Sequence, residues 1–593
     1  MSGLPLRILV SAVALLQIAI AGAPATAPAS TPKKAPQTRE ARAVQRWMRP
    51  MTLRDEVAQM VMISFTGRPL NTRSREYRKI EELVRREHVG GMILVNVTEG
   101  RLVQKAGPLE AAQFIDSMQA KAQVPLLISG DLERGASMRL EGTTVFPHAM
   151  AFTAGGNPAA ARFEGEVTAR EARAIGINWV FYPVADVNNN PDNPIINLRS
   201  FGENPEEVSE YVQAFIAGAH SVAGNYVLTT AKHFPGHGDT ATDTHVNLAT
   251  VSSDRKHLDT VEFVPFRGAI AGGVDSIMTA HLALPAIEEP DVPATLSPVI
   301  LTGLLRNELA FKGIVVTDAL EMGGIAKGFS IKEAAVRAVK AGADVLLMPR
   351  DPVAAIDAVV AAVKSGEIDR KRIQASVARL LAAKVKVGLD LNRRVDLAKI
   401  PDVINAPESQ QRAQEIADRA VTLVKNEANL VPLNKTARAC FVAMVESHNG
   451  QQGEQFAEEL RKSAPGAPLF SISPTEAKLS EPAILAAPCD NYVVATWVSV
   501  AAYRGDVVLG GDFPELLNNL IATKKPVVLV SLGNPYVVRS FPNVSAYLAT
   551  FTTVPPAEIS AVKALLGQIP ITGKLPVTIP GVAAYQYGLT VTR

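Results

Sequence analysis

The sequence predicts an α/β protein in which a (β/α)8 barrel of the TIM type precedes a smaller α/β sandwich with αβα layers. Between residues 45 and 390, short β-branched or apolar runs alternate with helical patterns, which is typical of repeated β/α units around a parallel sheet. The periodicity is lost over residues 391–415 and returns over residues 416–593. A chain of 593 residues is too long for one hydrophobic core and suits two or three domains.

Eight runs in the first segment are candidate strands, and eight β/α units are what a barrel of this type requires. The runs are QMVMISF (59–65), VGGMILVNV (89–97), PLLISGD (125–131), INWVFYPVADV (177–187), VLTTAKHF (227–234), DSIMTAHL (275–282), GIVVTDA (313–319) and ADVLLMP (343–349). We therefore assign residues 45–390 to the barrel.

The second segment contains four further candidate strands, separated by helical patterns. They are CFVAMV (440–445), NYVVATWV (491–498), PVVLVSL (526–532) and SAYLATF (545–551). This alternation favours an open, doubly wound sheet. The segment has no glycine-rich phosphate motif, so we expect no nucleotide and no other cofactor. We interpret residues 391–415 as an interdomain linker and 416–593 as the sandwich.

The N-terminus has the pattern of a secretory signal peptide. Arg7 precedes an apolar run over residues 8–20, and small residues follow, as in a cleavable signal over residues 1–23. An uncleaved membrane anchor is the alternative, but the run is shorter than the ~20 residues that a spanning helix needs. Residues 24–44 are rich in Ala, Pro, Thr and Ser and are expected to be a disordered linker. We expect an exported bacterial protein, periplasmic or extracellular, without stable membrane insertion.

The composition excludes several classes of partner. With 47% hydrophobic residues, 20% charged residues and a net charge of only +2, the chain has no large basic excess and is not expected to bind nucleic acid. Its two cysteines, Cys440 and Cys489, allow one disulfide but no disulfide framework. Nothing in the sequence sets the oligomeric state.

Several barrel runs end in polar or ionisable residues. These are Asp131, Asp186, Lys232 with His233, His281 and Asp318. Any one of them alone is more simply explained as a solvated loop residue or a helix cap. Because a parallel barrel brings the carboxyl ends of its strands to one face, together they indicate a functional site there.

The stretch KHFPGHGDTATDTH (232–245) is the most concentrated group of such residues. Gly236 and Gly238 interrupt regular structure and predict a shaped loop after the fifth strand. Asp243 and His245 are two residues apart, so the carboxylate can hydrogen-bond the imidazole and form a general acid/base pair that works near neutral pH. The alternative is that Asp243 caps a turn and His245 packs beside it.

A metal site is the competing interpretation of this region, because six of the nine histidines lie between residues 220 and 281. Histidine and aspartate do bind zinc. The sequence contains no HExxH and no paired-cysteine spacing, however, and Lys232 beside His233 would put a positive charge next to a cation. We expect no metal.

Asp318 follows an apolar strand at the end where a barrel presents catalytic groups. A carboxylate at this place can act as a nucleophile towards a sugar's anomeric carbon, with an acid opposite it. The alternative is that Asp318 caps the next helix.

Together these motifs resemble family 3 glycoside hydrolases, and specifically their β-N-acetylglucosaminidase branch with a His/Asp acid/base dyad. The resemblance covers about residues 45–590. It rests on KHFPGHGDTATDTH, NNNPDNPIINLRSFGENPEEV (188–208), MTAHLALPAI (278–287), PATLSPVIL (293–301) and FKGIVVTDALEM (311–322). AVTLVKNEANLVPLN (420–434) and GKLPVTIPG (573–581) resemble the beginning and end of the family's second domain.

The resemblance implies a retaining exo-glycosidase that works by double displacement. Asp318 would be the nucleophile and His245, assisted by Asp243, the acid/base. In this branch the acid/base is a histidine on a mobile barrel loop, whereas the family's two-domain glucosidases use a glutamate from the second domain. The residues that would hold the terminal sugar are Asp131, Arg199, Lys232 and His233.

Two positions depart from the family pattern. Ala136 stands where an arginine is frequent, and Ala319 where a second aspartate is common. Both departures could change what binds beyond the terminal sugar. His237 and Asp239 receive no role, and we expect them to shape the loop.

The leading hypothesis is an exported β-N-acetylglucosaminidase that acts on cell-wall fragments, including muropeptides, or on chitin oligosaccharides. A β-glucosidase or β-xylosidase of the same family is the first alternative. Because a neutral imidazole does not repel an anion as a carboxylate does, phosphate could replace water as the acceptor, which would give an N-acetylglucosaminide phosphorylase. A metal-dependent hydrolase and a degenerate sugar-binding protein without turnover also remain open.

Overall fold

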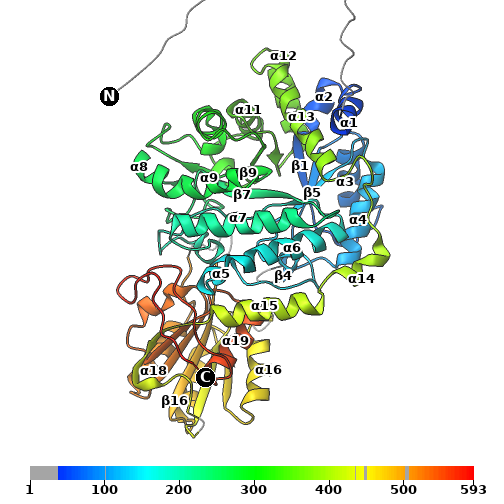
Figure 1. Cartoon of the computed structure of the whole chain (residues 1–593). Helices are drawn as coiled ribbons and strands as arrows, with labels where there is room; N and C mark the ends of the chain where they lie inside the picture. The colour runs from blue at the N-terminus through cyan, green and yellow to red at the C-terminus, as the bar shows by residue number, and fades with distance from the viewer. Residues whose placement is uncertain (1–37, 100–101, 435, 447–450, 501–505, 593) are drawn as a thin grey trace, which may run out of the picture. The chain divides into compact units, whose positions relative to one another are not determined.

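The computed structural model in Figure 1 describes residues 38–592, apart from 100–101, 435, 447–450 and 501–505. The expected signal peptide and residues 24–37 of the expected linker at 24–44 lie outside the described residues. The last part of that linker differs from expectation, because residues 39–44 begin helix α1 (Arg39–Met48). Ala43 is buried, and Trp47 packs against the barrel core one turn later. This apolar contact at helical spacing explains the helix.

Eight parallel strands form the first sheet, in the order β11-β9-β7-β6-β5-β2-β1-β12. The strands are β1 (Val61–Phe65), β2 (Gly91–Leu94), β5 (Leu127–Gly130), β6 (Trp179–Val180), β7 (Leu228–Phe234), β9 (Ser276–Thr279), β11 (Ile314–Thr317) and β12 (Leu346–Leu347). A bridge between Val316 and Val345 connects the two outer strands of this order. Each strand lies within one of the eight predicted runs, and the predicted barrel is confirmed.

Helices accompany the strands of the barrel in the chain. They are α2 (Leu53–Ala58), α3 (Arg75–Arg85), α4 (Pro108–Lys121), α5 (Ala149–Ala154), α6 (Pro158–Ile175), α7 (Pro205–Ser221), α8 (Arg255–His257), α9 (Phe263–Ala271), α10 (Gly323–Ala326), α11 (Ile331–Ala341), α12 (Pro352–Lys364) and α13 (Arg370–Lys386). Helices α6 and α7 lie side by side (Figure 1). Both begin with an asparagine cap, Asn157 or Asn204, followed by proline. The asparagine side chain accepts a backbone N–H of the first turn, and the proline presets the helical φ angle.

Two small additions matter for the site. The strands β3 (Val97–Glu99) and β4 (Leu102–Gln104) pair antiparallel in the loop after β2. A short 3-10 helix, η2 (Asn197–Arg199), follows β6.

A second sheet of six strands contains the four predicted runs, in the order β13-β18-β17-β16-β14-β15. Its strands are β13 (Thr422–Asn426), β14 (Ala439–Met444), β15 (Leu469–Ile472), β16 (Asn491–Val498), β17 (Val527–Gly533) and β18 (Ala546–Ala549), and its helices are α16 (Glu454–Ser463), α17 (Ala477–Ala486), α18 (Phe513–Ala522) and α19 (Pro555–Leu565). All neighbouring strands are parallel except β13 and β18. In the sequence, α14 (Ile400–Val403) and α15 (Pro407–Ala420) come between the last strand of the barrel and the first strand of the second sheet, so the predicted linker includes helical residues.

Successive residues of β16 face opposite sides of this sheet. Tyr492 and Val494 belong to one apolar core together with residues of α17 and α18, whereas Val493 and Ala495 belong to another with residues of α16 and α19. This alternation is the period of two of a strand. Helices therefore cover both faces, which confirms the predicted αβα sandwich.

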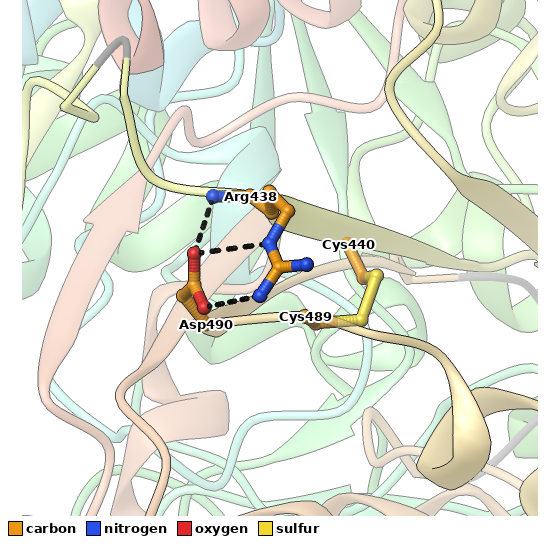
Figure 2. Close-up of a disulfide and its surroundings, with 4 residues drawn as sticks. All are labelled: Arg438, Cys440, Cys489 and Asp490. Atoms are coloured by element: carbon orange, nitrogen blue, oxygen red, sulfur yellow. Dashed lines mark hydrogen bonds and ion pairs between the residues drawn. A yellow bond between two sulfur atoms is a disulfide. The ribbon is translucent and has the colours of Figure 1, made fainter.

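Cys440 of β14 and Cys489, just before β16, form the disulfide that the sequence allowed, with their Cα atoms 5.6 Å apart (Figure 2). Arg438 and Asp490 form an ion pair beside it, with a nitrogen–oxygen distance of 3.2 Å. The bond joins two neighbouring parallel strands at the start of each. Among the described segments of the chain, no helix combines the length and the apolar character needed to cross a bilayer.

Candidate active site

The side chains expected at the site come from the carboxyl ends of the barrel strands. Asp131 follows β5, Lys232 and His233 lie near the end of β7, and Asp318 follows β11. Arg199 is the last residue of the short helix η2. In a parallel barrel these ends share one face, so the arrangement agrees with the sequence prediction.

The four residues expected to hold a sugar are connected, and Glu133 is the centre of the network. Lys232 Nζ donates to Asp131 Oδ1 at 2.9 Å and lies 2.7 Å from Glu133 Oε1. Arg199 contacts Glu133 with two nitrogens, Nε to Oε2 at 2.9 Å and Nη2 to Oε1 at 2.8 Å. Such two-pronged contacts fix the orientation of the guanidinium as well as its charge.

Opposite charges keep the two carboxyl groups ionised. Burial alone would raise the pKa of Asp131, but Lys232 and Arg139 outweigh it and lower the pKa to about 2. In the same way, burial of Glu133 is outweighed by Arg199 and Lys232, which hold its pKa well below the usual value. Both groups are therefore hydrogen-bond acceptors at neutral pH.

His233 is fixed in one tautomer by its two neighbours. Its Nδ1 lies 2.7 Å from Asp186 Oδ2, and Arg199 Nη2 lies 3.4 Å from its Nε2. An arginine only donates, so Nε2 accepts and Nδ1 carries the proton that is given to Asp186. Asp186 also accepts the backbone N–H groups of His233 and His237, at 3.0 and 2.8 Å.

Asp318 is half-buried, and three histidines are near enough to influence its charge. The backbone N–H of Ala319 donates to its Oδ1 at 2.7 Å. Burial would raise the pKa of Asp318, but His233, His281 and His245 together lower it below the usual value. The carboxyl group is therefore ionised at neutral pH, as a nucleophilic carboxylate must be.

Asp243 and His245 are paired as the sequence predicted. His245 Nδ1 lies 2.8 Å from Asp243 Oδ1, and the backbone N–H of His245 donates to the same oxygen at 2.9 Å. The Asp243 side chain is buried, whereas that of His245 is 24% exposed. The carboxylate is thus shielded and the imidazole remains accessible.

Backbone hydrogen bonds join the dyad loop to the segment after Asp318. Gly323 donates to the carbonyl of His245 at 3.0 Å, and Gly324 to that of Thr244 at 3.1 Å. A Cβ atom on Gly323 would lie 2.3 Å from the Val246 carbonyl oxygen. Only glycine fits such a close approach of two backbones, so these two glycines hold the loop beside Asp318.

Sequence reasoning missed Glu133 and gave no role to Asp186 or His281. His281 is buried; its Nε2 lies 3.0 Å from the carbonyl oxygen of Ala319 and its Nδ1 lies 2.9 Å from Thr295 Oγ1, so it supports the turn after Asp318. The sequence did contain a signal for these three residues: Asp186 and His281 lie at the ends of predicted strands, and Glu133 comes two residues after the end of another.

The two residues left without a role make contacts within or beside the loop. The imidazole of His237 lies between the hydroxyl groups of Thr240 and Thr244, each 3.0 Å from a ring nitrogen. Asp239 accepts a hydrogen bond from Ser253. Within the part of the chain that the structure describes, no three histidine, cysteine or acidic side chains converge in a way that would hold a metal ion.

Comparisons with known proteins agree with this geometry. Residues 52–383 match the glycosyl hydrolase family 3 N terminal domain, and residues 421–591 match the C-terminal domain of the same family. A Beta-N-acetylglucosaminidase/beta-glucosidase of Cellulomonas fimi is 30% identical over 525 residues, which is 84% of this chain and 89% of that protein.

Two further relatives agree. Beta-hexosaminidase A of Pseudoalteromonas piscicida is 30% identical over 560 residues, 84% of this chain and 91% of that protein. The solved structure of a glycoside hydrolase family 3 beta-N-acetylglucosaminidase from Paenibacillus sp. str. FPU-7 has a TM-score of 0.78 at 35% identity, covering 89% of this chain and 99% of that one. With its barrel, its second sheet and its Asp243–His245 pair, the chain belongs to glycoside hydrolase family 3, in the β-N-acetylglucosaminidase branch.

Proposed function

We propose that this glycoside hydrolase is an exported, retaining exo-β-N-acetylglucosaminidase. It removes terminal N-acetylglucosamine from cell-wall fragments or chitin oligosaccharides by double displacement. The observation that carries the proposal is an ionised carboxylate, Asp318, on a segment that is hydrogen-bonded to the loop of a His–Asp pair.

In the first step Asp318 attacks the anomeric carbon and the bond to the leaving oxygen breaks. His245, protonated on both nitrogens, gives its Nε2 proton to that oxygen, while Asp243 holds Nδ1–H and stabilises the cation before transfer. The products are a covalent glycosyl-enzyme ester and the neutral aglycone.

In the second step neutral His245 takes a proton from water at Nε2, and the hydroxyl oxygen attacks the anomeric carbon. The ester bond breaks and Asp318 returns as a carboxylate. Two inversions leave the configuration unchanged. The same imidazole is acid and then base, which suits a group that Asp243 keeps in one orientation.

The sugar contacts follow from the charges. Asp131 and Glu133 are ionised and accept from sugar hydroxyl groups, while Arg199 and Lys232 donate. In this assignment His233, with Nδ1 committed to Asp186, presents Nε2 to the sugar.

Chromogenic substrates test the proposal directly. The 4-nitrophenyl N-acetyl-β-glucosaminide should be cleaved with a higher kcat/KM than the β-glucoside or β-xyloside, and faster glucoside cleavage would favour a β-glucosidase. Asp318→Ala should lower kcat by about 10⁴-fold or more, because no covalent intermediate can form. Added azide should restore turnover and give the α-glycosyl azide, while the exposed control Asp402→Asn should behave as wild type.

Product analysis distinguishes hydrolysis from phosphorolysis and from binding without turnover. A muropeptide disaccharide and chitobiose, compared with and without phosphate, identify the preferred substrate, and formation of sugar 1-phosphate would favour phosphorolysis. Sugar binding without any turnover by the wild-type protein would favour the degenerate binding protein. Export is tested by assaying periplasmic and culture fractions of the producing cells for the full activity.

A further inference from the structure

Two cations lie on the barrel face that carries the candidate site, on the loops that follow β2 and β5. Arg134 comes three residues after Asp131, in the segment that also supplies Glu133. Lys105 follows β4, and its neighbour Ala106 is bridged to Leu140. The two loops are joined by backbone hydrogen bonds, from Ala106 to the Arg139 carbonyl at 3.1 Å and from Glu141 to the Ala106 carbonyl at 3.0 Å.

These two cations differ from the others of the site in forming no ion pair within the described residues. Arg139, Arg199 and Lys232 each contact Asp131 or Glu133. The side chains of Lys105 and Arg134 form no ion pair or hydrogen bond with any residue in the described ranges. Both are only partly exposed.

The positions are electrostatically unfavourable. Burial lowers the pKa of Lys105 to about 8, and the charge of Arg134 adds to that effect, with only a partial offset from Glu141. Burial likewise lowers the pKa of Arg134, where Glu133 opposes the shift and Arg139 adds to it. Glu141 is exposed and forms no ion pair with Lys105 among the described residues. Two like charges, partly desolvated and near each other, destabilise the fold unless an anion binds between them.

In this part of the barrel mouth, the face formed by the carboxyl ends of the strands, positive charges outnumber negative charges. Three of the five cations here are bonded to the buried carboxylates Asp131 and Glu133, whereas Lys105 is near only the exposed Glu141 and Arg134 only the already paired Glu133. The cations are Lys105, Arg134, Arg139, Arg199 and Lys232. The nearby Asp186 is engaged by His233 and by the backbone of His237. A neutral sugar would leave the excess positive charge uncompensated.

The strand order places the pair relative to the reaction. Between β5 and β11 lie three strands in each direction around the barrel, β9, β7 and β6 on one side and β2, β1 and β12 on the other. The loop of Arg134 therefore lies across the mouth from Asp318. Under the proposed mechanism, an anion bound there would be a substituent of the terminal sugar, on the side of that sugar away from the bond that is cleaved.

We propose that Arg134 and Lys105 bind an anionic substituent, a carboxylate or a phosphate ester, on the terminal N-acetylhexosamine of the substrate. This inference rests on the proposed function, since it assigns the terminal sugar to Asp131, Arg199, Lys232 and His233. The planar guanidinium matches either anion with two hydrogen bonds, and the ammonium group adds a point charge. The site thereby distinguishes a charged terminal sugar from a neutral one.

Three glycosides with the same 4-nitrophenyl leaving group test the inference. They carry N-acetylglucosamine, its 6-phosphate or its 3-O-lactyl ether, so the neutral, phosphate and carboxylate cases are compared with the chemistry held constant. One of the two anionic glycosides should exceed the neutral one in kcat/KM by about tenfold or more. This preference should shrink as sodium chloride rises from about 50 to 500 mM, because salt screens accessible charges.

Charge-removing variants identify the residues. Arg134→Met and Lys105→Met should each lower the ratio of anionic to neutral kcat/KM by about tenfold, mainly through KM. Arg134→Lys should retain part of the preference. Lys312→Met, which removes an exposed cation before β11, is the matched control and should keep the wild-type ratio.

The outcomes separate this inference from the proposed function. A neutral glycoside that is cleaved best, with a ratio that Arg134→Met does not change, overturns the anion site and leaves the glycosidase assignment intact. If no glycoside is cleaved, the proposed function fails, and calorimetry with N-acetylglucosamine 6-phosphate and 3-O-lactyl-N-acetylglucosamine still decides the anion site. Binding that Arg134→Met weakens supports it, and no binding of either sugar overturns it.

Discussion

The two sides of the barrel mouth use different means to hold their side chains. On the β5 side, Asp131, Glu133, Arg199 and Lys232 form a network of permanent opposite charges at 2.7–2.9 Å. On the β11 side, three histidines influence the charge of Asp318, and its segment is joined to the dyad loop through backbone hydrogen bonds.

Under the proposed function, the difference corresponds to two tasks. A charge network with ionised carboxylates and committed cations does not change state on binding, so it can hold a sugar in one orientation. Proton transfer needs groups that gain and lose charge near neutral pH, which is the property of histidine. Substitutions on the β11 side should therefore reduce kcat, and those on the β5 side should affect KM and folding stability.

After Asp318→Ala, the largest effect is expected at the Asp243–His245 dyad. His245→Ala should lower kcat by about 10³-fold, because both proton transfers lose their partner. The pH profile of kcat should lose the limb that reports the protonated acid. Substrates with a good leaving group, which needs little protonation, should accumulate the glycosyl-enzyme, visible as a mass increase of the intact protein. An unchanged pH profile would assign the acid/base role to another residue.

At Glu133, the centre of the charge network, we expect a smaller effect on turnover than at the dyad and a larger effect on folding stability. Glu133→Gln should raise KM by about 10²-fold and destabilise the fold by about 3 kcal/mol, since Lys232 and Arg199 lose a buried counter-ion. The pKa of Glu133 is depressed on folding, so its stabilising contribution is present above the usual value of 4.5 and is lost as the pH falls below it.

Denaturant titrations at several pH values check the predicted direction of the change in stability with pH. The wild-type free energy of unfolding should fall between about pH 5 and pH 2, and that of Glu133→Gln should fall less steeply. Glu210→Gln, at an exposed position on α7, is a control that should follow the wild type. Equal slopes for wild type and Glu133→Gln would contradict the assigned charge state.

The smallest effect is expected at the contact between the two loops. Gly324→Ala should lower kcat by about tenfold with little change in KM, since its Cβ would lie 3.2 Å from the carbonyl oxygen of Thr244 and push the dyad loop away from Asp318. Gly328→Ala, at a glycine with open space around its Cα, is the matched control. A change in KM alone would place the effect in sugar binding instead.

The sequence was sufficient for the strands that are buried on both faces. Near-continuous apolar runs such as VVLVSL in β17 are recognisable without context. The edge strand β15 was missed because its residues Leu469–Ile472 are mostly half-exposed, and β13 because it runs antiparallel and its last two residues are only half-buried. Short edge strands derive their structure from the neighbouring strand rather than from their own pattern.

The candidate site was predictable where chemistry follows from proximity in sequence. Asp243 and His245 are two residues apart, and their contact could be anticipated. Glu133 joins Arg199 and Lys232 from two other segments, and only the fold brings these three together. Likewise, two consecutive glycines predict a flexible turn. Gly323 and Gly324 instead allow close approach of the backbone of the dyad loop, which is about 80 residues away in the sequence.

The disulfide in the second sheet offers a chemical test of the proposed export. Both cysteines of the chain are used in it, so the oxidised protein has no free thiol. Thiols stay reduced in the bacterial cytosol and are oxidised outside it. Under the proposed export, protein that stayed in the cytosol would carry two thiols that are alkylated after denaturation, because both cysteines are buried, and exported protein would carry none. The redox state of Cys440 and Cys489 would then be a chemical test of that export.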